Sequence, residues 1–170
     1  MPDTQEVFLD LESDMSVIVE VLQRVDTEDA AQAVMLVRVL PRTPFTDILR
    51  FRFHFDSLAH DNSAGSQKIL NVALPNELET TSPPETPPPI ILHGEQIVQK
   101  FNRTTLDRVC MFVALYRIKA KQVDLVLTAN IPTTLTESLQ SDEATFQRLS
   151  KKKFDRAVES LKVLDFELFV

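Results

Sequence analysis

Residues 109–118, VCMFVALYRI, restrict the fold most, because nearly every position in this run is apolar. A strand with apolar side chains on both faces has to be covered on both sides. After a polar turn at residues 119–122, apolar residues alternate through residues 123–131, up to Pro132. The two segments predict a long hairpin at the centre of an antiparallel sheet, with helices against both faces.

Four further strands are predicted around this hairpin. Residues 49–58, LRFRFHFDSL, alternate phenylalanine with polar or charged residues, and a period of two is typical of a half-buried strand. A turn at residues 60–66 and a strand at residues 68–74 complete a second predicted hairpin. Residues 5–11 and 90–101 supply the other two strands.

Three helices are predicted from apolar residues spaced three and four apart. The first follows Asp14 as its N-cap and covers residues 15–25, the second covers residues 27–40, and the third follows Ser141 as its N-cap. The inward face of the third is predicted to carry Phe146, Leu149, Phe154, Ala157, Val158 and Leu161. We therefore expect an α+β fold, a largely antiparallel sheet sandwiched by helices on both faces, as one domain over residues 1–170.

Charge and composition narrow the class of partner. The net charge of −7 disfavours nucleic acid and anionic membranes, and it fits a basic protein partner better. No apolar run approaches the roughly 18–20 residues of a membrane span, and we expect no secretory signal. The single cysteine, Cys110, favours a reducing compartment such as the cytosol or nucleus. With only two glycines, the sequence contains no glycine-rich phosphate-binding loop.

Residues 75–89, PNELETTSPPETPPP, are rich in proline and acidic residues. Because this segment has almost nothing to bury, we predict an extended, mobile surface loop. Proline-recognition domains bind such sequences, so a role as their ligand stays open as an alternative.

No group of residues in the sequence supports catalysis. His54, His60 and His93 have no second metal-binding residue at a usual ligand spacing. We expect His54 to be solvated or hydrogen-bonded on the polar face of its strand, and Cys110 to be a buried thiol. The chain is therefore expected to be non-catalytic, with no metal and no cofactor.

Several segments carry motifs that occur together in one family. Residues 2–8, PDTQEVF, match the pattern P-D-x-Q-E-V-aromatic, and residues 16–23, SVIVEVLQ, resemble the family helix that follows it. Residues 53–59, FHFDSLA, resemble a family strand. Residues 114–132 resemble the family hairpin, and residues 154–169 resemble its C-terminal helix and tail. In this order, and over nearly the whole chain, the sequence resembles the Ran guanine nucleotide release factors, known in fungi as the Mog protein.

The resemblance implies a fold, a partner and an activity. Members of the family have an antiparallel sheet between helices, similar to the photosynthetic protein PsbP. They bind the small GTPase Ran, promote loss of its guanine nucleotide, GTP especially, and support nuclear protein import. By resemblance, the chain is expected to bind Ran in the nucleus and cytoplasm as a release factor rather than an enzyme. Other nuclear transport factors are further candidate partners.

Two other classes of function stay open. One is an adaptor that binds Ran or a transport factor without changing the bound nucleotide. The other is a small-ligand binder or enzyme that uses a pocket between the sheet and a helix. A ligand that raises the melting temperature without Ran would favour the latter.

The resemblance also implies binding residues in the first motif and in the predicted helix after it. Carried onto this sequence, these residues are Asp3, Glu6 and Glu20, with Gln23 where the family has a further acidic residue. That departure removes one charge, and a charge-assisted hydrogen bond is about twice as strong as a neutral one. From the residues alone, Asp3 and Glu6 can equally be charges in a turn and on a solvated edge. Glu20 can equally form an ion pair with Arg24 on the surface of the predicted helix. The resemblance favours Asp3 and Glu20 as binding residues.

In the family, a further N-terminal strand precedes the P-D-x-Q-E-V motif, whereas here Met1 stands directly before it. Without that strand, we expect an unpaired sheet edge and a thinner core. The chain should then melt at a lower temperature than a version that carries the upstream segment.

Overall fold

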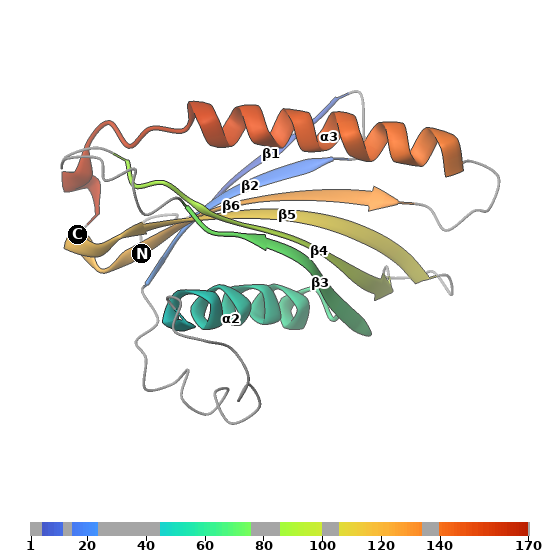
Figure 1. Ribbon diagram of the computed structural model, residues 1–170, viewed down its shortest axis with the longest axis horizontal. Helices are drawn as coiled ribbons and strands as arrows, with labels where there is room; N and C mark the ends of the chain where they lie inside the picture. The colour runs from blue at the N-terminus through green and yellow to red at the C-terminus, as the bar shows by residue number, and fades with distance from the viewer. Residues whose placement is uncertain are drawn as a thin grey trace.

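Six antiparallel strands form one sheet in the described part of this computed structural model, in the order β1-β2-β6-β5-β4-β3 (Figure 1). The structure describes residues 5–11, 15–23, 45–75, 86–99, 106–133 and 140–169. Helix α2 packs on one face of the sheet and helix α3 on the other. The bounds are β1 Gln5–Leu9, β2 Ser16–Gln23, α2 Phe45–Asp61, β3 Ser66–Ala73, β4 Ile90–Gln99, β5 Leu106–Ile118, β6 Val123–Thr133 and α3 Gln140–Ser160. The predicted α+β sandwich is confirmed.

The predicted central hairpin is formed by β5 and β6, which the short 3-10 helix η2 (Lys119–Lys121) connects. Gln122 closes the turn in the left-handed region, with φ of 56°. The predicted end at Pro132 is wrong, because β6 continues through this residue. Pro132 pairs with Val109 of β5, but β2 ends opposite Asn130, so the missing N–H of proline interrupts no bond on the β2 side.

The first predicted helix is wrong, because residues 15–25 contain strand β2, Ser16–Gln23. This strand pairs with both β1 and β6. Val17, Val19 and Val21 alternate and pack on the core beneath α3. Seven of the eleven residues at 15–25 are apolar, and their positions fit both helical spacing and alternation, while the β-branched valines favour a strand.

The predicted strand at residues 49–58 is also wrong, because these residues lie within α2. Phe55 is 1% exposed and Ala59, one turn later, is 6% exposed, whereas Phe53 is 45% exposed. Burial therefore follows one face of a helix and not every second residue. The predicted hairpin with residues 68–74 is replaced by antiparallel pairing of β3 with β4.

Helix α2 can lie close to the sheet because β4 carries a glycine at the contact. A Cβ atom on Gly94 would lie 2.6 Å from Cζ of Phe55 and 3.0 Å from the carbonyl oxygen of Lys68. The missing side chain leaves the space that the phenylalanine ring fills.

Helix α3 begins at Gln140, one residue before the predicted N-cap, Ser141. Phe154 is buried in the core beneath the helix, with its ring centroid 5.6 Å from that of Phe112 in β5. Leu149 was predicted to face the core, but 52% of it is exposed. The other five residues predicted to face the core do so, and Ser150 is buried on the same side; the five are Phe146, Phe154, Ala157, Val158 and Leu161.

Two predicted segments lie wholly or mostly outside the described residues. They are the second helix, at residues 27–40, and the proline-rich loop at residues 75–89, of which Pro75 and residues 86–89 are described. Both stay predictions. In the ranges that the structure covers, none of the helices has the length and apolar character needed to cross a membrane.

Candidate functional site

The β1–β2 hairpin contains the predicted binding residues Glu6 and Glu20. Its strands are antiparallel, with Gln5 opposite Glu20 and Glu6 opposite Val19. Gln5 donates a hydrogen bond from Nε2 to Oε1 of Glu20 over 2.6 Å. This cross-strand bond holds the Glu20 carboxylate beside the edge strand.

Glu6 and Glu20 lie on opposite faces of the sheet. Paired residues in antiparallel strands share a face, and successive residues alternate between faces. Val19, opposite Glu6, packs on the α3 side. Glu20 pairs with Val126, which packs on the α2 side. The two carboxylates therefore flank one edge from both faces and do not form a single cluster.

The structure says less about the other two predicted binding residues, Gln23 and Asp3. Gln23 is the last residue of β2 and pairs with Val123 of β6. Asp3 lies outside the described residues. Glu20 lies in a strand and accepts a hydrogen bond from Gln5, whereas Arg24, its predicted partner, lies outside the described residues.

Sequence reasoning missed the exposed apolar side chains beside these carboxylates. Val7, Phe8 and Leu9 are 53%, 58% and 73% exposed. β1 is also the last strand of the described sheet, so its outer backbone groups have no strand partner there. Exposed apolar residues rimmed by charge are typical of protein-binding surfaces. The sequence did indicate this exposure, because three consecutive apolar residues in a strand cannot all face the same side of the sheet.

The opposite sheet edge, β3, has a different character. A bulge interrupts its pairing with β4 between Ile69 and Asn71, and Lys68 is exposed beside it. Bulges and edge lysines are features that discourage pairing with another chain. The contrast makes β1, with Glu6 and Glu20, the better candidate for binding a protein. We call this surface the β1 edge.

An ion pair connects the turn after β1 to helix α3. Nζ of Lys153 lies 2.5 Å from Oδ2 of Asp10. The backbone N–H of Asp10 also donates to the carbonyl oxygen of Met15, which is buried in the core. These contacts hold the hairpin in place relative to the helix.

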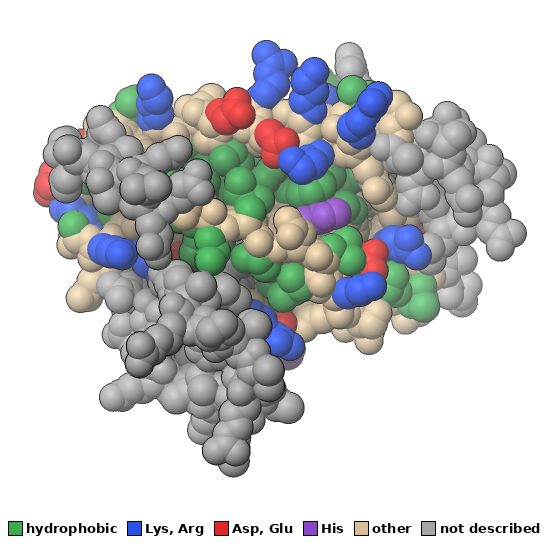
Figure 2. Space-filling model, viewed as in Figure 1, with side chains coloured by type: hydrophobic (Ala, Val, Ile, Leu, Met, Phe, Trp, Pro, Cys, Tyr) green, Lys and Arg blue, Asp and Glu red, His purple; other side chains and the backbone are tan. Residues whose placement is uncertain are grey.

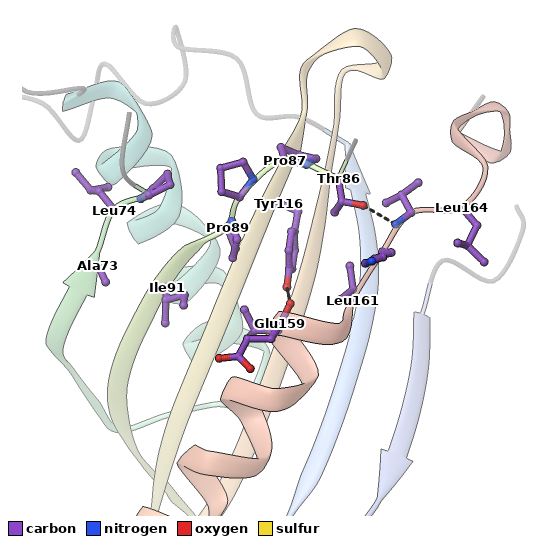
Figure 3. Close-up of a pocket in the computed structure, with 15 residues that line it drawn as sticks. Ala73, Leu74, Thr86, Pro87, Pro89, Ile91, Tyr116, Glu159, Leu161 and Leu164 are labelled. Carbon is purple, nitrogen blue, oxygen red and sulfur yellow. Dashed lines mark hydrogen bonds between the residues drawn. The ribbon is translucent and has the colours of Figure 1, made fainter. Parts of the chain in front are cut away.

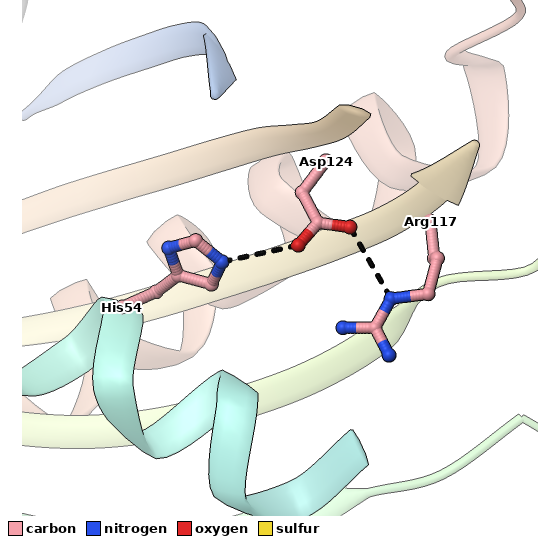
Figure 4. A network of polar contacts seen from close by, with 3 residues as sticks. All are labelled: His54, Arg117 and Asp124. Atoms are coloured by element: carbon pink, nitrogen blue, oxygen red, sulfur yellow. Dashed lines mark hydrogen bonds and ion pairs between the residues drawn. The ribbon is translucent and has the colours of Figure 1, made fainter. Parts of the chain in front are cut away.

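A buried polar network joins α2 to the central hairpin (Figure 4). His54 donates from Nε2 to Oδ2 of Asp124, and Arg117 donates from Nε to Oδ1, each over 3.2 Å. Burial raises the pKa of Asp124, but the hydrogen bond from His54 and the charge of Arg117 outweigh it, so the pKa lies below its ordinary value. His54 is hydrogen-bonded, as one predicted alternative had it, but on a buried helix face and not on a strand.

A second polar contact joins β4 to β5. Nε2 of His93 lies 3.2 Å from Sγ of Cys110, and the imidazole stacks on Phe112 with ring centroids 4.5 Å apart. Burial lowers the pKa of His93; the charge of Lys151 adds to this and that of Glu95 opposes it. Cys110 is buried as predicted. Among the residues that the structure places, no three His, Cys, Asp or Glu side chains group where they could hold a metal.

A cavity of about 720 Å³ lies between the end of α3, the end of β3 and residues 86–89 (Figure 3). Tyr116 of β5 stands within it and donates its hydroxyl to the carbonyl oxygen of Val158 over 3.0 Å. The N–H of Val163 donates to Oγ1 of Thr86 over 2.7 Å, which ties the proline segment to the chain after α3. Small-molecule sites have volumes of roughly 300–1,000 Å³.

Comparison with known proteins relates these features to a family. The sequence model described as "Ran-interacting Mog1 protein" matches residues 1–132. The chain belongs to this family. The matched residues of this Mog1-family chain include the β1 edge and the central hairpin and end before α3.

Two curated relatives extend over the whole chain. A Dictyostelium discoideum protein named "Probable ran guanine nucleotide release factor" is 28% identical over 180 residues, covering 100% of this chain and 83% of its own length. The Danio rerio "Ran guanine nucleotide release factor" is 26% identical over 176 residues, covering 99% of this chain and 85% of its own length. The crystal structure of the Saccharomyces cerevisiae Ran-binding protein Mog1p superposes with a TM-score of 0.61 at 20% identity, over 100% of this chain and 84% of that one. The Mog1-family fold is therefore shared.

Proposed function

We propose that this chain binds the small GTPase Ran and promotes release of its bound guanine nucleotide, in support of nuclear protein import. It does so as a single domain in the nucleus and cytoplasm. The β1 edge carries the proposal, since Val7, Phe8 and Leu9 are exposed there directly after Glu6, and Glu20 lies across the hairpin from Gln5. Relatives named as Ran guanine nucleotide release factors support the choice of partner.

Release of a nucleotide requires only a difference in binding. A protein accelerates release when it binds the nucleotide-poor GTPase more tightly than the nucleotide-bound form. By linkage, the nucleotide then weakens the grip of the protein by the same factor. No covalent step is involved, so the chain acts as a binding protein and not as a classical enzyme.

The carboxylate of Glu20 is the group that we propose competes with the nucleotide phosphates for basic groups of Ran. Gln5 holds it beside the exposed edge strand, where a partner's basic side chains can reach it. Basic groups that hold the nucleotide phosphates also bind carboxylates through charge-assisted hydrogen bonds. A carboxylate at that place competes with the nucleotide for the same groups. Asp3 and Gln23 stay predicted contributors.

The test is release of a fluorescent GTP analogue from purified Ran, with binding measured in parallel. The variant Glu20→Lys should abolish both binding and accelerated release, because it places a like charge against the basic partner groups. Asp61→Lys, at the exposed end of α2, makes the same charge change away from the β1 edge and should behave as the unmodified chain. Accelerated release by a correctly folded Glu20→Lys variant would show that the electrostatic assignment is wrong. Binding without acceleration by the unmodified chain would identify an adaptor instead.

A second candidate function rests on the cavity beside Tyr116. It lies between the sheet and the end of α3, and its volume suits a small ligand. Glu159 and Lys162 are the charged side chains in its lining. A small molecule that raises the melting temperature of the chain in the absence of Ran would favour this candidate.

A further inference from the structure

Helix α3 carries a charge opposite to that of the chain as a whole. Its residues include Arg148, Lys151, Lys152, Lys153 and Arg156, against Asp142, Glu143, Asp155 and Glu159, so five basic and four acidic residues give a net charge of +1. The chain nevertheless has a net charge of −7. Figure 2 shows several Lys and Arg side chains along the top of the molecule, where α3 lies in Figure 1. The five basic residues of α3 lie close together, between Arg148 and Arg156.

The basic residues of α3 divide into two groups by their contacts. Nζ of Lys151 lies 2.6 Å from Oδ2 of Asp155, and Lys153 pairs with Asp10. Arg148, Lys152 and Arg156 are exposed and form no ion pair with any residue for which the structure gives a position. We call these three residues the α3 stripe.

The α3 stripe is a straight row on the outer side of the helix. Its members are four residues apart, so they follow one another along the helix surface at steps of about 6 Å. Ser150 and Phe154 are buried on the side that faces the sheet. The stripe therefore points away from the core, and its charges do not take part in folding contacts of the described residues.

An exposed apolar residue lies beside the stripe. Leu149 is 52% exposed, and its spacing to Lys152 and Arg156 places it on the same outer side of α3. A leucine between basic side chains gives a partner apolar contact in addition to charge. Such a mixture is typical of an interaction surface.

We propose that the α3 stripe is a docking site for an acidic segment of a partner protein. In an extended segment, side chains on one side recur about every 6.6 Å, which matches the step between the stripe residues. Glutamate or aspartate at every second position would therefore meet Arg148, Lys152 and Arg156 in turn. Charge-assisted hydrogen bonds to carboxylates are the contacts that arginine makes best.

The charge distribution favours a protein segment over nucleic acid. The positive surface is one short row, and the remainder of the chain is strongly negative. A long polyanion extending past the stripe would be repelled by that remainder. A short acidic segment fits within the stripe and avoids the repulsion.

This site lies on a different element from the proposed Ran-binding β1 edge, although the Asp10–Lys153 ion pair joins the turn after β1 to α3. The stripe lies on α3, beyond the residues 1–132 that match the family, and the β1 edge lies on the first two strands. The inference does not rest on nucleotide release, so either proposal can fail without the other.

The experiment measures fluorescence anisotropy of a short labelled peptide of alternating glutamate and serine, titrated with the full chain at low ionic strength. Replacing the stripe by Arg148→Gln, Lys152→Gln and Arg156→Gln should weaken binding roughly tenfold or more, because each exposed pair contributes about two- to fivefold. Added salt should weaken binding to the unmodified chain and have little effect on what remains in the variant.

A matched control removes the same charge elsewhere. Arg52→Gln, Lys68→Gln and Lys119→Gln alter exposed residues of α2, β3 and η2. This variant should bind the peptide as tightly as the unmodified chain. Equal weakening in both variants, or no binding of the peptide to the unmodified chain, would overturn the proposal. A single-stranded oligonucleotide of equal charge is titrated beside the peptide, and tighter binding of it would also overturn the choice of a protein segment.

Discussion

The carboxylate of Asp124 lies fully buried between His54 and Arg117, so its substitution should affect stability strongly. Asp124→Asn should lower the free energy of unfolding by about 3–5 kcal/mol, because it leaves the Arg117 charge buried without its counter-charge. Urea unfolding of the variant and the unmodified chain measures this loss. A difference below about 1 kcal/mol would show that the ion pair is not what stabilises the hairpin against α2.

The same residue predicts how stability depends on acid pH. The pKa of Asp124 in the folded chain is held below its ordinary value of 3.8. Its contribution is therefore fully present above that value and is lost as the pH falls through 3.8 toward the folded pKa. The unmodified chain should lose stability more steeply than Asp124→Asn in this acid range, as followed by urea unfolding at a series of pH values. Parallel pH profiles of the two proteins would contradict the assignment.

Tyr116 predicts a corresponding effect at alkaline pH. Burial raises its pKa from 10.0 to about 12, and its hydroxyl donates to Val158, near the end of α3. The contribution of the neutral phenol is fully present below pH 10.0 and is lost as the pH rises toward 12. Tyr116→Phe should lower the free energy of unfolding by about 1 kcal/mol at neutral pH and remove this alkaline loss. Thermal melts at neutral and alkaline pH, compared between the two proteins, check both statements.

Among the elements, the packing of α2 on β4 depends on one glycine. Gly94→Ala should push Phe55 away from the sheet, because the added Cβ would lie 2.6 Å from its ring. We expect a loss of about 1–3 kcal/mol in unfolding free energy, the usual effect of overpacking. Gly65→Ala is the matched control, since its nearest neighbour would be 3.9 Å away. Equal melting temperatures for the two variants would show that α2 moves freely over the sheet.

How far each element could be predicted depends on what surrounds it. The central hairpin was predictable, because a strand with apolar residues on both faces, as at 109–118, has to lie inside a sheet that is covered on both sides. Residues 15–25 and 49–58 were assigned to the wrong element, because their apolar residues fit periods of both two and 3.6. Their structure is decided by distant partners, namely the pairing of β2 with β6 and the space above Gly94.

The candidate site could be predicted only in part. The resemblance pointed to Glu6 and Glu20, but their separation onto opposite faces follows from strand register, which the mistaken helix concealed. The exposure of Phe8 depends on β1 being an edge strand, and the order of strands in a sheet cannot be inferred from the local sequence. Of the α3 stripe, only Lys152 belongs to the run of three lysines in the sequence, and it became distinct only when Lys151 and Lys153 were seen to be paired.

For the whole molecule, the β1 edge predicts a variant that separates binding from stability. Phe8→Ala should weaken Ran binding about tenfold or more, because exposed aromatic residues at interfaces are often dominant contacts. It should change the free energy of unfolding by less than about 0.5 kcal/mol, because the side chain is mostly exposed. Titration with Ran and a thermal melt measure the two quantities. Phe53→Ala, on α2, removes another exposed phenylalanine and should leave binding intact; if it weakens binding equally, the β1 edge is not the contact surface.

The strand order also affects when β2 can pair with its inner neighbour during synthesis of the chain. β2 ends at Gln23, but its inner partner β6 begins at Val123, about 100 residues later. A ribosome adds about 5–20 residues each second, so the valine-rich β2 is synthesised roughly 5–20 s before the strand that pairs with it. During that interval the nascent N-terminal hairpin is a natural client for chaperones. The β1–β2 hairpin can therefore join the sheet only after β6 has been synthesised.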